Sequence, residues 1–192
     1  MAIPREFLSH LAAEMAKRLE KSGKIKFPDQ AAAAARIQQV FQDDAAREDQ
    51  LNQEVRDYLA QHNETIRRDN ISYQEMYQMV KRELMKKYKM VHAGGRDRDG
   101  GKLSRDKVIE MSHALVKSLA ALPQTELVQE KNDVRLEIMS ELQALLREEA
   151  AIDRAARQKI LTQKKEIVEG SGEWDILFRK YYSEEMRKLG VS

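Results

Sequence analysis

Apolar residues recur at three- and four-residue steps through most of this chain, which is the spacing of amphipathic helices. The first such stripe predicts an N-terminal helix and comprises Ile3, Phe7, Leu8, Leu11, Met15 and Leu19. Ser22 and Gly23 end this helix, because glycine tolerates the left-handed backbone common just after a helix C-terminus. The segment Lys24–Phe27 then alternates polar and apolar residues, a pattern typical of a half-buried extended segment.

Two further helices complete the first half of the chain. A long helix is predicted from Gln30 to His62, because its apolar stripe runs without glycine or proline and Asp29 can cap its first turn. At 1.5 Å per residue this helix would be roughly 50 Å long. The run Ser72–Glu75 has the form of a capping box, so a third helix is expected from there to about Tyr88.

The second half of the chain repeats the pattern of the first. Apolar positions coincide at an offset of 100 residues through the first helix and, after one extra residue, at 101 through the next two. Matched positions include Leu8 with Val108, Leu11 with Met111, Phe41 with Leu142, Leu59 with Ile160 and Tyr73 with Trp174. Thr125–Val128 stands where the extended segment stood. Agreement through three helices with one shift indicates an internal duplication.

A glycine-rich stretch lies between the two halves. Residues 93–101 place two glycine pairs around four alternating charges and contain no large apolar residue. Glycine makes ordering of the backbone costly, so this stretch is interpreted as a flexible linker. We therefore divide the chain into a first helical repeat (1–92), the linker (93–101) and a second helical repeat (102–192).

The fold class predicted from these patterns is all-α. Each repeat is expected to be a three-helix unit with a short helix, a long helix and a C-terminal helix, and with a short extended segment after the first helix. Three helices leave much of the long apolar stripe uncovered, so we expect the two units to pack together as a pseudo-two-fold pair. The two extended segments would then be available to form a small ribbon.

Composition narrows the classes of function. The 192 residues are 34% charged, yet the formal net charge is only +2, so binding to nucleic acid or a membrane would need a local patch. The absence of cysteine excludes disulfides and thiolate metal sites and suits a reducing compartment. No apolar run reaches the length of a membrane span, so we expect a soluble, cytoplasmic protein without a membrane partner.

The second repeat also carries a recognisable motif. The run Gly170–Gly190, with its Trp-Asp and Lys-Tyr-Tyr elements, resembles the C-terminal signature of a bacterial family known as domain of unknown function 507. Lys102–Ser104 and Arg147–Glu149 also look like that family, and the first repeat is similar to a more diverged member through Ile71–Tyr73 and Met76–Arg82. The resemblance implies a small helical domain in tandem and brings no catalytic residue with it.

The aromatic edge of the last helix is the first candidate for binding a partner. Trp174, Phe178 and Tyr181 share one face at four- and three-residue steps, and packing in the core is the expected role of that face. Tyr182 is expected outside this stripe, among basic residues, as an exposed anchor for another protein. The partner-binding residues predicted from the sequence are Trp174, Arg179, Lys180 and Tyr182.

A basic run near the end of the third helix is the alternative candidate. Five cations there could neutralise phosphates of RNA or DNA and give salt-dependent binding. They are Lys81, Arg82, Lys86, Lys87 and Lys89. A solvated face that complements the helix dipole explains the same residues, and the second repeat does not keep them.

Two glutamates are the only candidates for acid–base chemistry. Glu48 and Glu149 occupy matching places on the long helices, where the apolar stripe passes. The spacing favours a solvated ladder with Arg56 or Arg157 over a buried carboxylate. Neither a metal-binding histidine pair nor a phosphate-binding loop is present in the sequence. We therefore expect no enzyme, no metal and no cofactor, but a non-enzymatic module that binds another protein, with RNA or DNA binding as the alternative.

Overall fold

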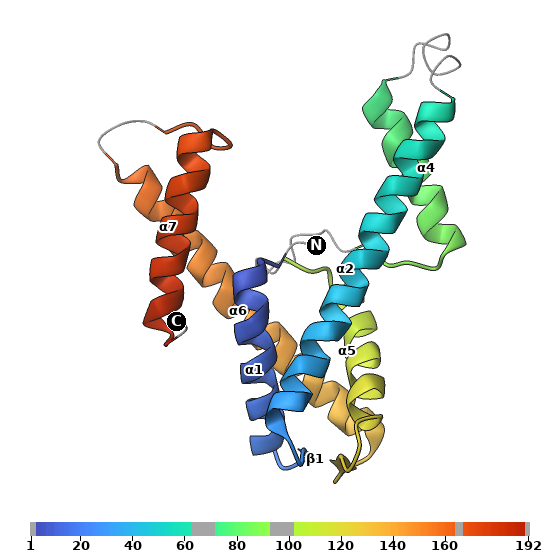
Figure 1. Ribbon diagram of the computed structural model, residues 1–192, viewed down its shortest axis with the longest axis vertical. Helices are drawn as coiled ribbons and strands as arrows, with labels where there is room; N and C mark the ends of the chain where they lie inside the picture. Colours follow the sequence, from blue (N-terminus) through green and yellow to red (C-terminus); the bar gives the residue numbers. More distant parts are fainter. Residues whose placement is uncertain (1–2, 63–71, 93–101, 164–166, 191–192) are drawn as a thin grey trace.

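Helices account for nearly all the regular structure of this protein (Figure 1). The computed structural model describes residues 3–62, 72–92, 102–163 and 167–190. Within these ranges lie helices α1 (Arg5–Lys21), α2 (Gln30–Gln61), α4 (Tyr73–Lys87), α5 (Arg105–Ala120), α6 (Lys131–Leu161) and α7 (Gly172–Lys188), and strands β1 (Ile25–Lys26) and β2 (Glu126–Leu127). The predicted all-α class is confirmed. The glycine-rich stretch 93–101 lies outside the described residues.

Polar caps set where the helices begin. Asp29 accepts hydrogen bonds from two backbone N–H groups in the first turn of α2, at 2.9 and 3.1 Å. Ser72 and Glu75 form the predicted capping box at the start of α4. Ser104 and Ser171 cap α5 and α7, each accepting from the backbone nitrogen three residues later. These side chains satisfy N–H groups that have no partner in the first helical turn.

A two-residue ribbon joins segments that lie about a hundred positions apart in the sequence. β1 and β2 pair antiparallel, with Ile25 opposite Leu127 and Lys26 opposite Glu126. Ile25 is fully buried, while Lys26 and Glu126 form an exposed ion pair at 3.3 Å. Both strands fall in segments that the sequence predicts to be extended.

The central core is built from α1, α5 and the N-terminal parts of α2 and α6. α1 packs on both long helices, and α5 packs on the same two. Large, fully buried side chains here include Phe7, Leu11, Met15, Leu19, Ile37, Phe41, Leu115, Leu119, Ile138 and Leu142. Their removal from water is the main stabilising contribution to the fold.

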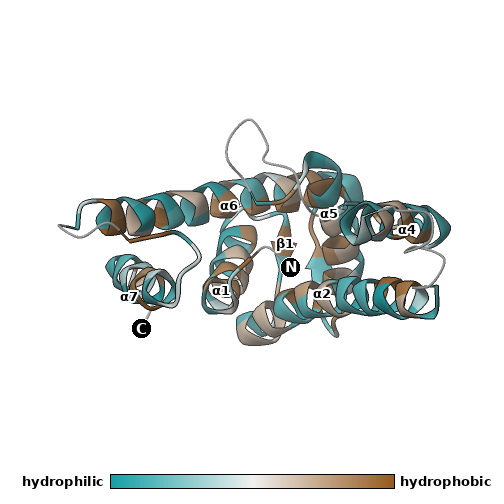
Figure 2. Ribbon diagram, turned by 90° about the horizontal axis from the view of Figure 1, so that it is seen from above, coloured by the Kyte–Doolittle hydropathy of each residue, from teal (hydrophilic) through white to brown (hydrophobic). Residues whose placement is uncertain are grey.

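The C-terminal parts of α2 and α6 diverge from this core, and each carries one more helix (Figures 1 and 2). α4 lies along α2 and α7 lies along α6. We call these pairs the α2–α4 arm and the α6–α7 arm. Seen from above, the arms point away from the centre on opposite sides (Figure 2). The two sets of residues predicted to bind partners are on different arms.

Candidate functional site

α4 contacts α2 through one face only. This inner face consists of the half-buried residues Met76, Tyr77, Val80 and Leu84, which pack on Val55 and Leu59. The Tyr77 hydroxyl donates a hydrogen bond to Asn52 Oδ1 at 3.0 Å, and the Tyr88 hydroxyl donates to Glu54 Oε1 at 2.8 Å. No residue within Tyr73–Lys87 is buried. The outer face of α4 is therefore surface, and it carries the predicted basic run.

The five basic residues differ in how they are paired. Lys81 is partly covered and lies 3.7 Å from Glu48 of α2, and Lys86 forms an exposed ion pair with Glu83 at 2.7 Å. The Lys87 ammonium lies 5.2 Å from the centre of the Tyr88 ring. Arg82 and Lys89 are exposed and have no ion pair within the described ranges of the chain.

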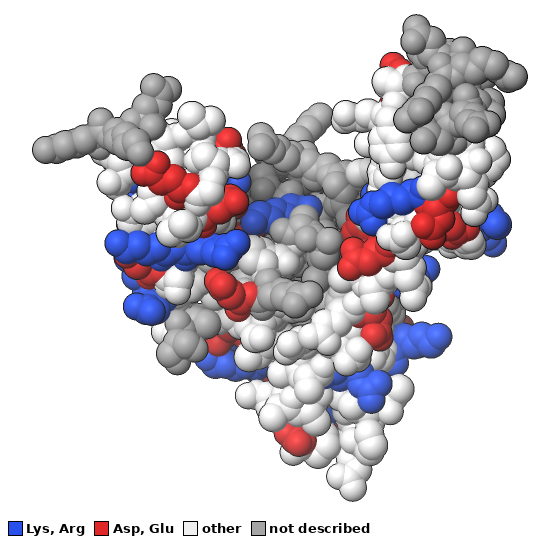
Figure 3. Space-filling model, turned by 45° about the horizontal axis from the view of Figure 1, so that its top comes forward, with Lys and Arg blue, Asp and Glu red and all other residues white. Residues whose placement is uncertain are grey.

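The turn that follows α4 brings these cations to one groove. Lys89 has a φ of 51°, in the left-handed region that non-glycine residues rarely adopt, and the Met90 backbone nitrogen donates to the Met85 carbonyl at 2.9 Å. The groove has a volume of about 410 Å³ and is lined by Gln78, Lys81, Arg82, Met85, Lys86, Lys89, Met90 and His92. Lysine and arginine side chains of the α2–α4 arm lie at the surface beside acidic ones (Figure 3).

The groove unites four of the five predicted basic residues, and Lys87 does not line it. Sequence reasoning missed Met85 and Met90, which give the groove apolar lining between the cations. The sequence could have predicted Met85 as part of the groove, because Met85 lies four residues after Lys81 and outside the inner-face stripe. It could not have predicted Met90, because only the turn at Lys89 places Met90 there.

The structure overturns the expected exposure of Tyr182, whereas the burial of Trp174 agrees with the core packing expected of its stripe. Tyr182 is 2% exposed and Trp174 is 6% exposed, so neither can serve as a surface anchor. Trp174, Phe178, Tyr182 and Met186 follow one another at four-residue steps and form one row on the helix. The row faces inward, and the Phe178 and Tyr182 rings lie 5.6 Å apart. Of the predicted partner-binding residues only Arg179 and Lys180 are exposed.

Tyr182 belongs to a buried polar cluster around Glu149. The Tyr182 hydroxyl donates to Glu149 Oε1 at 3.1 Å, and the Lys102 ammonium donates to the same oxygen at 2.5 Å. Lys102 also lies 3.2 Å from Asp153, which pairs with Arg157 at 2.6 Å. The predicted solvated position of Glu149 is therefore wrong, since its side chain is fully buried. Its partner Lys102 comes from a distant part of the sequence, which helical spacing cannot show.

Burial dominates the electrostatics of this cluster. Desolvation raises the pKa of Glu149 above its ordinary value, although Lys102 opposes the shift. Burial and the neighbouring Glu149 carboxylate raise the pKa of the Tyr182 hydroxyl, so this group is a proton donor at neutral pH. Glu149 Oε2 is buried without a hydrogen-bond partner among the described residues. The cluster ties α7 and the start of the second half of the chain to α6.

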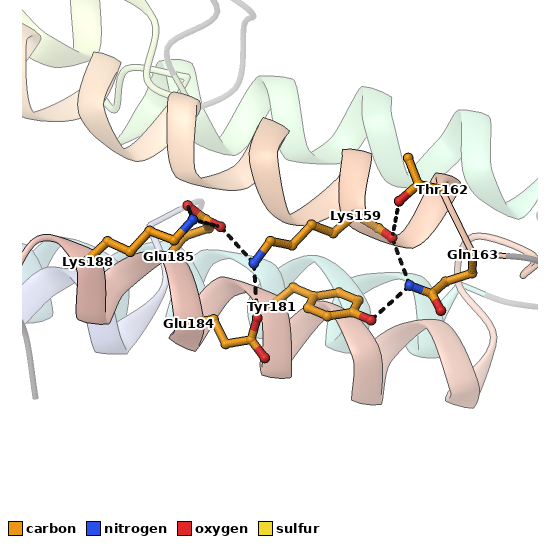
Figure 4. Close-up of polar contacts among 7 residues, drawn as sticks. All are labelled: Lys159, Thr162, Gln163, Tyr181, Glu184, Glu185 and Lys188. Atoms are coloured by element: carbon orange, nitrogen blue, oxygen red, sulfur yellow. Dashed lines mark hydrogen bonds and ion pairs between the residues drawn. The ribbon is translucent and has the colours of Figure 1, made fainter.

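A second set of polar contacts, on the surface, holds α7 along α6 (Figure 4). Lys159 of α6 lies 2.9 Å from both Glu184 and Glu185 of α7, and Gln163 donates to the Tyr181 hydroxyl at 2.9 Å. The hydrogen bond from Lys159 holds the pKa of Glu184 below its ordinary value. These two acidic residues of α7 are therefore engaged within the arm.

Neither a membrane span nor a metal site adds to these surfaces in the part of the chain that the structure describes. No described helix is both long and apolar enough to cross a membrane. No group of three or more side chains able to hold a metal ion occurs in the ranges that the structure covers. Among the described residues, the groove on α4 and the exposed cations of α7 are the surface features open to a ligand.

Comparison with known proteins identifies a family for this chain. No curated protein matches it. A family model does match, and the match spans residues 1–191, which is nearly the whole sequence. The chain therefore belongs to DUF507, a family of proteins of unknown function.

Proposed function

We propose that this protein is a non-enzymatic interaction module and that it docks on another macromolecule through the outer face of α4. The observation that carries the proposal is the groove, in which cations from α4 and the following turn surround two methionines. The burial of Tyr182 moves the favoured surface from α7, where the sequence alone places it, to α4.

Charge favours a nucleic acid as the ligand of this face. Residues 73–89 hold five cations and two carboxylates, a formal charge of +3, which exceeds the +2 of the whole chain. The excess positive charge is thus local, which is the condition for binding phosphates by a nearly neutral protein. Arg82 and Lys89 are the best candidates for direct phosphate contacts, because no carboxylate of the described chain pairs with them.

Two matched double variants test the proposal. Arg82→Glu with Lys89→Glu removes one arginine and one lysine from the groove, and Arg179→Glu with Lys180→Glu makes the same change of charge on α7. Binding of a fluorescent single-stranded RNA and of a DNA duplex would be followed by anisotropy at several salt concentrations. We expect only the α4 variant to lose binding, and the slope of log K against log salt to fall by about 0.7–0.9 for each phosphate contact removed.

Equal losses in the two variants would mean that net charge, not the groove, governs binding. Absence of binding by the unaltered protein at about 50 mM salt would contradict the nucleic-acid proposal outright. Circular dichroism of both variants would check that the helices are intact, which is the expected result because all four positions are exposed.

A protein partner on α7 is the second candidate. Ile176 is 70% exposed and lies one turn before Arg179 and Lys180 on the same side of the helix. A large exposed aliphatic residue beside cations suits a partner surface that is apolar and acidic. Pull-down from source cells, with and without nuclease, separates the two candidates. Capture that survives nuclease and is lost in the α7 variant would favour the protein partner.

We also infer that the chain is a tandem duplication with helical repeats at 1–92 and 102–192. The element order helix, strand, helix, helix occurs twice in the described residues, and the two strands pair with each other. Contacts of α1 with α6 have a counterpart in contacts of α5 with α2. These relations support a pseudo-two-fold arrangement of the repeats. Its test is superposition of the repeats in an experimental structure, in which a rotation far from a half-turn would contradict it.

A cytoplasmic location completes the proposal. It is supported by the absence of cysteine, which suits a reducing compartment, and by the proposed ligand class, which is found there. Fractionation of source cells with an antibody to the protein is the direct measurement. Recovery with the membrane or the exported fraction would contradict it.

A further inference from the structure

We infer that the contact between α4 and the C-terminal part of α2, residues 51–61, opens in the native protein. In this motion α4 separates from α2 while α7 stays packed on α6. This motion does not depend on what the α4 groove binds. It follows from three differences between the two arms.

The first difference lies in the apolar contacts. α7 buries Trp174, Tyr182 and Met186, and the last two belong to the central core. α4 buries no residue, and its four half-buried side chains form with Val55 and Leu59 a cluster separate from that core. Local opening costs least where few apolar side chains are buried and where they are not shared with the core.

The second difference lies in the long helices. No residue of α2 is buried between Phe41 and Leu51. The matching stretch of α6 is continuous with the core and buries Leu142, Leu145, Leu146, Glu149, Ala150 and Ile152. The α2–α4 arm is therefore linked to the apolar core by a length of helix that buries none of its own residues and is held to α5 by the Asp44–Lys107 pair. Separation of α4 from α2 beyond this stretch leaves the apolar core intact.

The third difference lies in the polar contacts at matched positions. Tyr182 and Glu149 are both buried, so water cannot readily replace their hydrogen bond. Lys81 and Glu48 occupy the corresponding positions, at an offset of 101, with side chains 18% and 25% exposed and 3.7 Å apart. A partly exposed ion pair of this length contributes less than a buried hydrogen bond, because water and salt can still reach both charges.

Opening would have a specific outcome. It would expose the inner face of α4, namely Met76, Tyr77, Val80 and Leu84, together with Val55 and Leu59. The basic outer face lies on the same helix. One helix could thus present an apolar face as well as a basic one without unfolding the remaining protein.

Native-state hydrogen exchange of the full chain, followed by mass spectrometry, tests the inference. After correction for intrinsic rates, we expect protection of amides in α4 to be at least about tenfold lower than in α7. Equal protection in α4 and α7 of the unaltered protein would overturn the inference. This comparison needs no variant, so failure of a mutant to fold cannot leave the question open.

A disulfide provides the second part of the test. The chain has no cysteine, so Val55→Cys with Val80→Cys introduces one defined pair into the α2–α4 cluster. Oxidation should raise protection in α4 at least about tenfold, leave α7 unchanged and be reversed by dithiothreitol. A rise of protection throughout the chain would show that α4 opens only with global unfolding, and would also overturn the inference.

Discussion

The Tyr182 hydroxyl donates a hydrogen bond of 3.1 Å to Glu149, and both side chains are buried. This contact fixes α7 against α6 at the point where the α6–α7 arm meets the core. The corresponding positions on the other arm hold Lys81 and Glu48, which form a looser and partly exposed pair. The two arms, although similar in their elements, are therefore held together by different contacts.

Removal of the Tyr182 hydroxyl should destabilise the protein. Tyr182→Phe keeps the ring in place but leaves the buried Glu149 oxygen with Lys102 alone. A hydrogen bond to a charged group contributes about 1.5–3 kcal/mol, so we expect a loss of that size in the free energy of unfolding. Urea unfolding followed by the fluorescence of Trp174, the only tryptophan, measures it directly on the affected arm.

Tyr77→Phe is the matched control on the other arm. It removes a partly buried hydrogen bond to the neutral side chain of Asn52. The expected loss is smaller, about 0.5–1.5 kcal/mol. Equal losses for the two phenylalanine variants would contradict the special role assigned to the Tyr182–Glu149 contact.

Glu149 should affect how stability varies with pH. Burial raises the pKa of Glu149 in the folded state above its ordinary 4.5, so folding favours the protonated form. The native state then binds more protons than the unfolded state between these two pKa values, and Glu149 stabilises the protein less as pH rises through that window. The unfolding free energy of wild type minus that of Glu149→Gln, both measured by urea unfolding, should therefore fall as pH rises from 4.5.

Glu14 should show the opposite sign. Burial raises its pKa, but Lys17 at 3.1 Å and Arg18 at 3.6 Å outweigh this and hold the pKa below 4.5. Its contribution to stability is present above pH 4.5 and is lost as pH falls through the lower, folded-state pKa. Urea unfolding of Glu14→Gln across the same pH series measures this contribution. If the difference in unfolding free energy from wild type varies with pH in the same way for Glu14→Gln and Glu149→Gln, both assignments are contradicted.

A buried lysine links α5 to α2. Lys107 is 3% exposed, and its ammonium lies 2.5 Å from Asp44 and 2.8 Å from Glu110. Asp44→Asn leaves that buried charge with one ionised partner, whereas Lys107→Met leaves two carboxylates that water can partly reach. We expect Asp44→Asn to cost about 3 kcal/mol, and Lys107→Met to cost less. Thermal unfolding of both variants would reveal the order, and the reverse order would refute this account.

A contact equivalent to Tyr182–Glu149 can be introduced on the α2–α4 arm by one substitution. Lys81→Tyr places a tyrosine at the position that matches Tyr182, opposite Glu48. We expect the new hydroxyl to reach Glu48 and to raise the protection of α4 amides several-fold over Lys81→Phe, which has the ring alone. If the tyrosine and phenylalanine variants exchange alike, positions 48 and 81 are not equivalent to 149 and 182.

Elements that depend on local chemistry could be predicted from the sequence. The Asp29 cap and the Ser72–Glu75 capping box place the starts of α2 and α4 where the structure has them. The alternation at Lys24–Phe27 likewise predicts an extended segment, and β1 lies inside it. In each case the deciding interactions or residue pattern lie within a few residues along the chain.

The buried face of α7 and the burial of Glu149 could not be predicted in this way, because they depend on contacts between distant segments. The four-residue row from Trp174 to Met186 is present in the sequence, but a competing row through Tyr181 has equally helical spacing. Which of the two rows is buried is decided by the packing of α7 on α6. Glu149 becomes a buried partner because Lys102, 47 residues earlier, supplies its counter-charge.

The ribbon between β1 and β2 has a consequence for synthesis on the ribosome. Ile25 and Phe41 are buried in a core that Leu119 and Ile138 help to complete, so the first half of the chain emerges before its apolar cover exists. At about 5–20 residues per second, the missing hundred residues take roughly 5–20 s to arrive. We expect part of the apolar stripe of the first half to stay exposed to water during that interval, until the second half covers it.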